Sequence, residues 1–136
     1  MNKEFKELLN NFKKLNLPDN EYAIFGSGPM AVRGIRSTYD LDVFITNNLY
    51  QELTKKYTET KKGKIEIGNI EIYAPDNALI DNPEEVIKRA DTLEELKFIC
   101  LNDLIVWKKK MARPKDFNDI KLIKDYLNQI KQDSKK

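Results

Sequence analysis

The sequence predicts an α/β (α+β) domain in which helices pack against a mixed β-sheet and further helices close the chain. Short apolar runs alternate with segments of helical periodicity, and two alternating runs flank a Gly-Asn turn. The chain has 136 residues, 40% of them hydrophobic and 34% charged, which suits one globular unit. We expect an N-terminal helix at 1–20, a sheet core at 21–100, C-terminal helices at 101–132 and a frayed tail at 133–136.

Composition argues against several classes of protein. The net charge of +2 is too small to indicate nucleic-acid binding by itself. The single cysteine, Cys100, rules out an internal disulfide and favours a reducing, cytoplasmic setting. The absence of histidine excludes histidine-based acid–base catalysis. No apolar run has the length of a transmembrane helix, so we expect no membrane partner.

The first half of the chain alternates helix and strand. Apolar residues at helical spacing predict a first helix that ends before Pro18: Phe5, Leu8, Leu9, Phe12 and Leu15. Pro29 favours a short helix directly behind Ser27, because proline suits the first turn. The other elements expected here are strands at 21–25 and 40–45 and helices at 29–34 and 48–59.

The second half contains the clearest local signal, a β-hairpin at 64–73. Gly68-Asn69 is a two-residue turn of the kind that twisted hairpins favour, and it separates two alternating runs. Pro114 opens a final helix. The remaining elements expected are a helix at 82–90 capped by Asn82, a short strand or extended link at 96–101, a helix capped by Asn102 at 102–112, and a helix at 114–130.

Two aspartates stand out in the strand at 40–45. Alternate residues of a strand share a face, so its apolar residues point one way: Leu41, Val43 and Ile45. Asp40 and Asp42 then share the other face and repel each other unless a cation lies between them. Magnesium prefers such carboxylate oxygens together with phosphate oxygens. The alternative is an edge strand with a solvated polar face.

The hairpin offers a third carboxylate. With Gly68-Asn69 as the turn, Glu66 lies opposite Glu71, and directly opposed like charges are unfavourable. Either glutamate can complete a metal cluster with Asp40 and Asp42. The alternative is a hairpin whose outer face is simply solvated.

The Gly26-Ser27-Gly28 turn is a candidate phosphate site. Glycines let the backbone approach a ligand closely, and a helix N-terminus presents free N–H groups to an anion. A structural turn also explains the same residues. The turn matches neither the phosphate loop of ATPases nor the dinucleotide-binding fingerprint.

The last helix carries acidic residues on its apolar stripe, which consists of Ile120, Ile123, Leu127 and Ile130. Asp116 and Asp119 fall on the same stripe at its N-terminal end. Asp116 can simply favour the helix dipole. Asp119 can orient one of several cations that would bind a triphosphate: Lys108, Arg113 and Lys115. Alternatively, these cations are a solvated helix face.

Together these motifs resemble the small bacterial nucleotidyltransferases of the DNA polymerase β superfamily, including the abortive-infection-toxin group. The first part of the resemblance is FGSGPMAVRGIRSTYDLDVFI at 25–45. The second is LNDLIVWKKKMARPKDFNDI at 101–120, which is similar to the Lys…Arg-x-Lys-Asp-x-x-Asp tail of those enzymes. The resemblance implies a nucleotidyltransferase fold and a magnesium-dependent enzyme.

The resemblance also implies roles for individual residues. Asp40, Asp42 and a third carboxylate, Glu71 in preference to Glu66, would be catalytic and would bind two Mg²⁺ ions. Many relatives have aspartate at the third position, so the glutamate is a departure. The residues implied to bind the nucleotide are Gly26, Ser27, Arg36, Lys108, Lys115 and Asp119.

The implied reaction moves a nucleoside monophosphate from a nucleoside triphosphate such as ATP to an acceptor hydroxyl. The acceptor would be RNA, a protein or a small molecule, and the protein a component of a toxin–antitoxin pair. A homodimer is one way to complete the acceptor site. Two other readings stay open: an antitoxin-like module that keeps the fold and acts by binding a partner, and an unrelated α/β binding domain.

Overall fold

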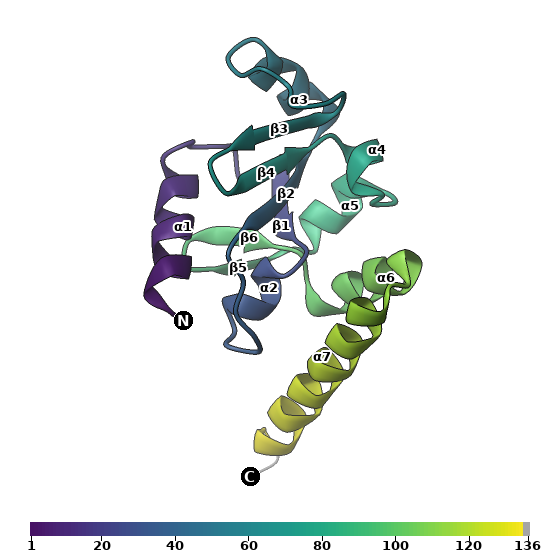
Figure 1. The fold of residues 1–136 in the computed structure, drawn as a ribbon. Helices are drawn as coiled ribbons and strands as arrows, with labels where there is room; N and C mark the ends of the chain where they lie inside the picture. Colours follow the sequence, from purple (N-terminus) through teal and green to yellow (C-terminus); the bar gives the residue numbers. More distant parts are fainter. Residues whose placement is uncertain (135–136) are drawn as a thin grey trace.

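A six-stranded mixed sheet forms the centre of the computed structural model, which describes residues 1–134 (Figure 1). The strand order is β3-β4-β2-β1-β6-β5. β2 runs parallel to β4 and antiparallel to β1, so the predicted mixed sheet and the α/β (α+β) class are confirmed. The strands are β1 Tyr22–Phe25, β2 Leu41–Ile45, β3 Lys64–Ile67, β4 Ile70–Tyr73, β5 Asp91–Leu93 and β6 Leu96–Phe98.

Helices cover both faces of this sheet. They are α1 Lys3–Lys13, α2 Gly28–Ala31, α3 Asn47–Thr54, α4 Pro75–Ala78, α5 Pro83–Lys88, α6 Leu101–Met111 and α7 Pro114–Asp133. The short α4 and the three-residue β5 were not predicted. None of the helices in the described part of the chain combines the length and apolar composition that a membrane crossing requires.

The core consists of two apolar clusters, one on each face of the sheet. α1 and α3 pack on the first face, where Leu41, Val43 and Ile45 of β2 are buried, as predicted. Phe44 points to the opposite face, which α5, α6 and α7 cover with a second cluster. Asp42 shares this face with Phe44, so the face is covered at Phe44 and only partly covered at Asp42.

Local sequence explains most helix boundaries, with two corrections. The Asn2 side chain caps α1 by accepting the Phe5 N–H at 2.8 Å, and Thr46 caps α3 in the same way. The predicted cap Asn102 is wrong, because it lies inside α6. Asn82 occupies the N-cap position of α5 as predicted, but it has a left-handed φ of 51° and its side chain makes no capping hydrogen bond. α3 ends at Thr54 rather than at residue 59.

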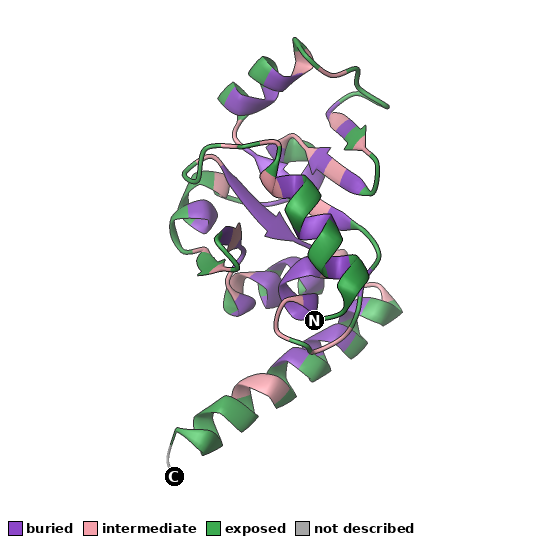
Figure 2. Ribbon diagram, turned by 90° about the vertical axis from the view of Figure 1, so that its left-hand side faces the viewer, coloured by how far each residue is buried: buried purple, intermediate pink, exposed green. Residues whose placement is uncertain are grey.

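α7 extends well beyond the body of the molecule (Figures 1 and 2). Ile120 and Ile123 of the predicted apolar stripe are buried, but Ile130 is 47% exposed, because no other element among residues 1–134 covers the end of the helix. Asp133 is still helical, so the predicted tail at 133–136 begins too early. Residues 135–136 lie outside the described part of the chain.

Candidate functional site

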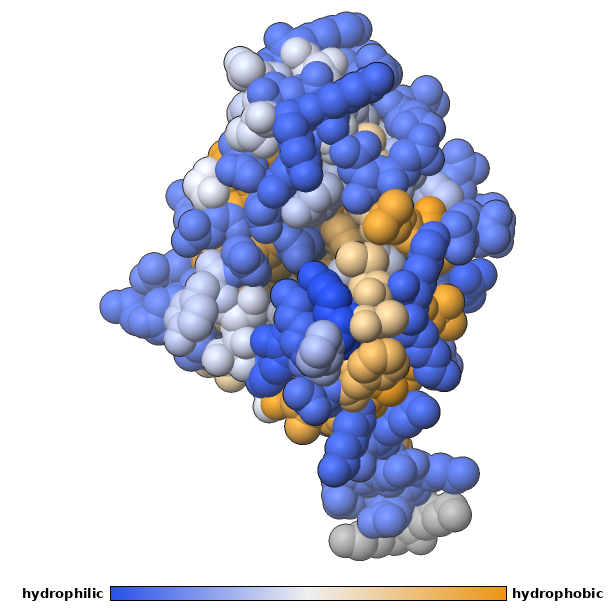
Figure 3. Space-filling model, turned by 45° about the vertical axis from the view of Figure 1, so that its right-hand side comes forward, coloured by the Kyte–Doolittle hydropathy of each residue, from blue (hydrophilic) through white to orange (hydrophobic). Residues whose placement is uncertain are grey.

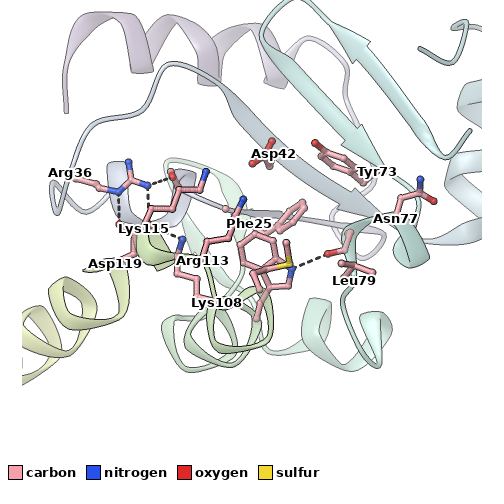
Figure 4. Close-up of a pocket in the computed structure, with 15 residues that line it drawn as sticks. Phe25, Arg36, Asp42, Tyr73, Asn77, Leu79, Lys108, Arg113, Lys115 and Asp119 are labelled. Atoms are coloured by element: carbon pink, nitrogen blue, oxygen red, sulfur yellow. Dashed lines mark hydrogen bonds and ion pairs between the residues drawn. The ribbon is translucent and has the colours of Figure 1, made fainter. Parts of the chain in front are cut away.

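A pocket of about 190 Å³ lies between the C-terminal end of β1, β4, α4 and the α6–α7 corner (Figure 4). Cations from the loop before β2 and from α6–α7 line one side, and apolar and aromatic residues line the other. The lining residues are Phe25, Gly26, Ser27, Arg36, Asp42, Tyr73, Asn77, Ala78, Leu79, Trp107, Lys108, Met111, Arg113, Lys115 and Asp119. Of the residues predicted to bind nucleotide, the fold brings all six to this pocket.

The Gly26 turn is packed against the acidic strand. Gly26 has a left-handed φ of 65°, and a Cβ placed on it would lie 2.5 Å from Asp42 Oδ2. Only glycine leaves room for the Asp42 carboxylate at this distance. The turn between β1 and α2 and the aspartate of β2 therefore form one continuous wall of the pocket.

Arg36 joins the loop before β2 to α7. Its Nε donates to Asp119 Oδ1 at 2.8 Å, and its Nη2 donates to Asp119 Oδ2 at 3.0 Å and also to the Ser27 hydroxyl. This paired geometry matches a guanidinium to a carboxylate. Arg36 is thus held with its charge beside the Ser27 turn.

Lys108 is a buried cation on the same carboxylate. Its side chain is 2% exposed, and its Nζ lies 2.9 Å from Asp119 Oδ2 and 3.9 Å from Asp116 Oδ1. Burial lowers the pKa of Lys108 in spite of Asp119. Burial opposes ionisation of Asp119 as well, but hydrogen bonds from Arg36 and Lys108 outweigh it and hold its pKa below the ordinary value. Asp119 organises two of the cations around the pocket.

Asp116 has a structural role. Its Oδ2 accepts the backbone N–H of Arg113 at 3.0 Å, which satisfies an otherwise free N–H at the start of α7, and it also accepts the Arg113 Nε–H at 2.7 Å. Arg113 also lies over the Trp107 ring, 5.9 Å from its centroid. Asp116 lies in the first turn of α7, where a negative charge interacts favourably with the helix dipole, as predicted. Its contacts also hold Arg113 at the rim of the pocket.

Lys115 differs from the other cations. It lies exposed in the first turn of α7 and makes no ion pair or hydrogen bond within residues 1–134. It lines the pocket beside Asp119, and it also lines an open cavity of about 550 Å³ next to Asp40 and Tyr39. Its ammonium group is therefore available to bind an anion.

The acidic residues form a row across three strands. Asp42 of β2 is level with Glu71 of β4, and Glu71 is level with Glu66 of β3, which confirms the predicted opposition of the two glutamates. Asp42 Oδ1 is buried and has no hydrogen-bond partner among the described residues. Burial, together with hydrogen bonding and charge from Glu71, raises the pKa of Asp42 to about 7.

Lys64 lies between the two glutamates. Its Nζ is 2.7 Å from Glu71 Oε1 and 3.0 Å from Glu66 Oε1, and these contacts raise the pKa of Lys64. Burial favours the protonated form of Glu71, but hydrogen bonds from Lys64 and Asp42 outweigh it and lower its pKa. Glu66 is exposed, whereas Glu71 is half-buried beside Asp42. Of the two glutamates, Glu71 is the one directly beside Asp42, and its role as a third metal-binding carboxylate stays a prediction.

Asp40 stands apart from this row. It is exposed just before β2, and the Thr38 hydroxyl donates to its Oδ1 at 3.3 Å. It lines the open cavity rather than the pocket, although its charge contributes to the raised pKa of Asp42. Within residues 1–134 no three acidic or cysteine side chains gather as a ready-made metal centre.

The apolar side of the pocket is built on Phe25. Its ring makes edge-to-face contacts with Trp107 at 5.1 Å and with Tyr73 at 5.7 Å between centroids. Trp107 Nε1 donates to the Ala78 carbonyl at 2.8 Å, so α4 is tied to α6. Figure 3 shows several apolar areas, in orange and tan, on an otherwise hydrophilic side of the molecule. A flat apolar group would find aromatic neighbours here.

Two features of the site were not predicted from the sequence. Lys64 shares a strand face with Glu66 and lies diagonal to Glu71, a relationship that the hairpin register already contained. The apolar side, with Phe25, Tyr73 and Leu79, gave no motif because its residues come from separate elements.

Comparison with known proteins adds no assignment to this geometry. The chain matches no protein-family model, and no curated protein matches it.

Proposed function

We propose that this protein is a magnesium-dependent nucleotidyltransferase, which moves a nucleoside monophosphate from a nucleoside triphosphate to an acceptor hydroxyl. The observation that carries the proposal is the contact between Gly26 and Asp42. It brings a glycine-serine turn, a carboxylate with one buried oxygen and a cation-lined pocket into one site. Phosphoryl-type transfer needs this combination, because positioning and charge supply most of the rate.

The cationic side of the pocket would bind the triphosphate. Arg36 is pre-oriented beside Ser27, and Lys115 has a free ammonium group on the same side. Arg113 at the rim adds a further charge. The apolar side, with Phe25 and Trp107, suits a planar base.

The acidic side of the site fits a divalent cation. Asp42 offers a buried oxygen that has no partner among the described residues, and Glu71 is its neighbour on the next strand. Asp40 adds negative charge from the exposed side. Magnesium bound by these carboxylates would lower the pKa of the attacking hydroxyl and neutralise the leaving phosphates.

In the reaction, the oxygen of the acceptor hydroxyl attacks the α-phosphorus and forms a new phosphodiester bond. The bond from the α-phosphorus to its bridging oxygen breaks, and pyrophosphate leaves toward Arg36 and Lys115. The hydroxyl proton passes to the pair formed by Asp42 and Glu71.

The acceptor would enter from the open cavity. Asp40, Tyr39 and Lys115 line this space of about 550 Å³, which adjoins the pocket at Ser27 and Arg36. Its open shape supports a large acceptor such as RNA or a protein segment, and a small molecule fits as well.

Labelling tests the proposal directly. The protein is incubated with each α-³²P-labelled nucleoside triphosphate, magnesium and either RNA or cell extract, and the products are separated by size. We expect one labelled acceptor with wild type and none with Asp42→Asn. Asp125→Asn, at an exposed position of α7, is the matched control and should label normally. Equal labelling by wild type and Asp42→Asn, or no labelling with any nucleotide, would refute the proposal.

A further inference from the structure

We propose that Lys64 replaces one of two divalent cations, so that each chain binds a single divalent cation at Asp42. This inference rests on the proposed function, since that function calls for a metal at these carboxylates. It departs from the two Mg²⁺ ions that the sequence resemblance implies. The ammonium group of Lys64 would be a permanent, covalently tethered cation in the acidic row.

The contacts of Lys64 carry the inference. Its Nζ lies 2.7 Å from Glu71 Oε1 and 3.0 Å from Glu66 Oε1, and its side chain is only 15% exposed. The same ammonium lies 5.3 Å from the centre of the Tyr73 ring. Three neighbours on two strands therefore hold one cation in place. Paired contacts of this length are charge-assisted hydrogen bonds rather than a loose surface attraction.

The charges along the row separate into two groups. Lys64 contacts both glutamates of the hairpin, Glu66 and Glu71. It makes no ion pair with Asp42, whose Oδ1 is buried and has no partner among residues 1–134. Asp42 is thus the carboxylate that still needs a cation. Asp40 is the nearest additional acid along the chain, and its charge acts on Asp42.

A second divalent ion at Glu71 would have to displace Lys64. An oxygen that accepts a hydrogen bond at 2.7 Å from an ammonium is already occupied on that side. A dication nearby would also be repelled by the ammonium charge in a partly buried site. Removal of the charge at position 64 should therefore open a second site, with Glu66 and Glu71 as its ligands.

Metal stoichiometry tests this inference without any turnover. Mn²⁺ alone is titrated into the full chain, and free Mn²⁺ is measured by electron paramagnetic resonance. We expect one bound ion for wild type, two for Lys64→Met and one for Lys64→Arg, which keeps the charge. Lys62→Met removes an exposed lysine from the turn just before β3 and should leave one ion. Asp42→Asn should lose the wild-type ion.

Two ions bound by wild type, or none, would overturn the inference, and so would one ion bound by Lys64→Met. Circular dichroism verifies that each variant is folded, and Lys64→Gln replaces Lys64→Met if the latter is not. The two proposals fail separately. A change from one ion to two without any labelled acceptor would refute only the proposed function. Normal labelling by a wild-type protein that binds two ions would refute only the role of Lys64.

Discussion

Gly26 lies so close to Asp42 that a Cβ on the glycine would be 2.5 Å from the aspartate Oδ2. The turn after β1 and the carboxylate of β2 are therefore mutually dependent. A methyl group at position 26 must push the Asp42 carboxylate away from its place in the pocket. It also requires an alanine in the left-handed conformation, because the φ of Gly26 is 65°.

Gly26→Ala should therefore destabilise the protein and remove labelling activity. Gly68→Ala is the matched control, because Gly68 has a φ of 58° and open space around its Cβ position. It should cost about 1 kcal/mol from the backbone alone. We expect Gly26→Ala to cost at least twice as much in urea unfolding. Equal losses in the two variants would contradict the contact.

The pH dependence of the free energy of unfolding should report the ionisation of the Asp42 carboxyl group. Its folded-state pKa is about 7, raised from 3.8. Stabilisation from its protonated form is complete below pH 4 and is lost as the pH rises through 7. The chain has no histidine. The lowered pKa values of Glu71, Asp116 and Asp119 confine their contributions to acidic pH.

Without metal, the free energy of unfolding should thus fall between pH 5 and 7 by up to about 1.4 kcal/mol per pH unit. Urea unfolding at half-unit intervals measures this slope. Asp42→Asn should flatten it, while Asp125→Asn should leave it unchanged. A rising slope in wild type over this range would contradict the assignment.

Removing Asp119 should leave two cations without their partner. Lys108 is 2% exposed, so Asp119→Asn leaves a buried ammonium poorly compensated. We expect a loss of about 3 kcal/mol in the free energy of unfolding, measured with urea. Lys108→Met added to Asp119→Asn should recover most of this loss, because the buried charge is gone. Simple addition of the two single losses would contradict the coupling.

Lys115 should contribute to nucleotide binding and not to stability. It makes no ion pair within the described residues, so Lys115→Ala should leave the urea midpoint unchanged. Loss of a charge-assisted contact to phosphate should weaken ATP binding about tenfold, measured by calorimetry with magnesium present. Lys121→Ala, also exposed on α7, is the control and should bind normally. Equal weakening in both variants would indicate only a nonspecific charge effect.

Hydrophobic periodicity predicted the elements that are long and regular. The hairpin was predicted with its register, because a two-residue turn aligns the strands directly and places Glu66 opposite Glu71. α4 and β5 escaped prediction because four and three residues are too few to display a period. The local pattern also favoured the wrong cap at Asn102, since a capping residue type says nothing about the path of the chain before it.

The residues of the site were predicted, but not their partners. Ser27, Arg36, Asp42, Lys108 and Asp119 were identified from residue type and spacing, and the roles in catalysis remain predictions. Arg36 and Asp119 are 83 residues apart, so no local rule relates them. Folding joins them because α7 packs over the face of the sheet that carries Asp42.

Lys64 also shows the difference between what local sequence predicts and what only folding decides. Alternation along β3 and β4 follows from local backbone geometry, so the face on which Lys64, Glu66 and Glu71 lie could be read from their order in the chain. Lys64 forms an ion pair with Glu71 and none with Asp42. This choice of partner depends on burial and on side-chain packing across strands. Burial is a property of the assembled sheet and its covering helices, which explains why charges and pKa values at this site emerge only in the folded protein.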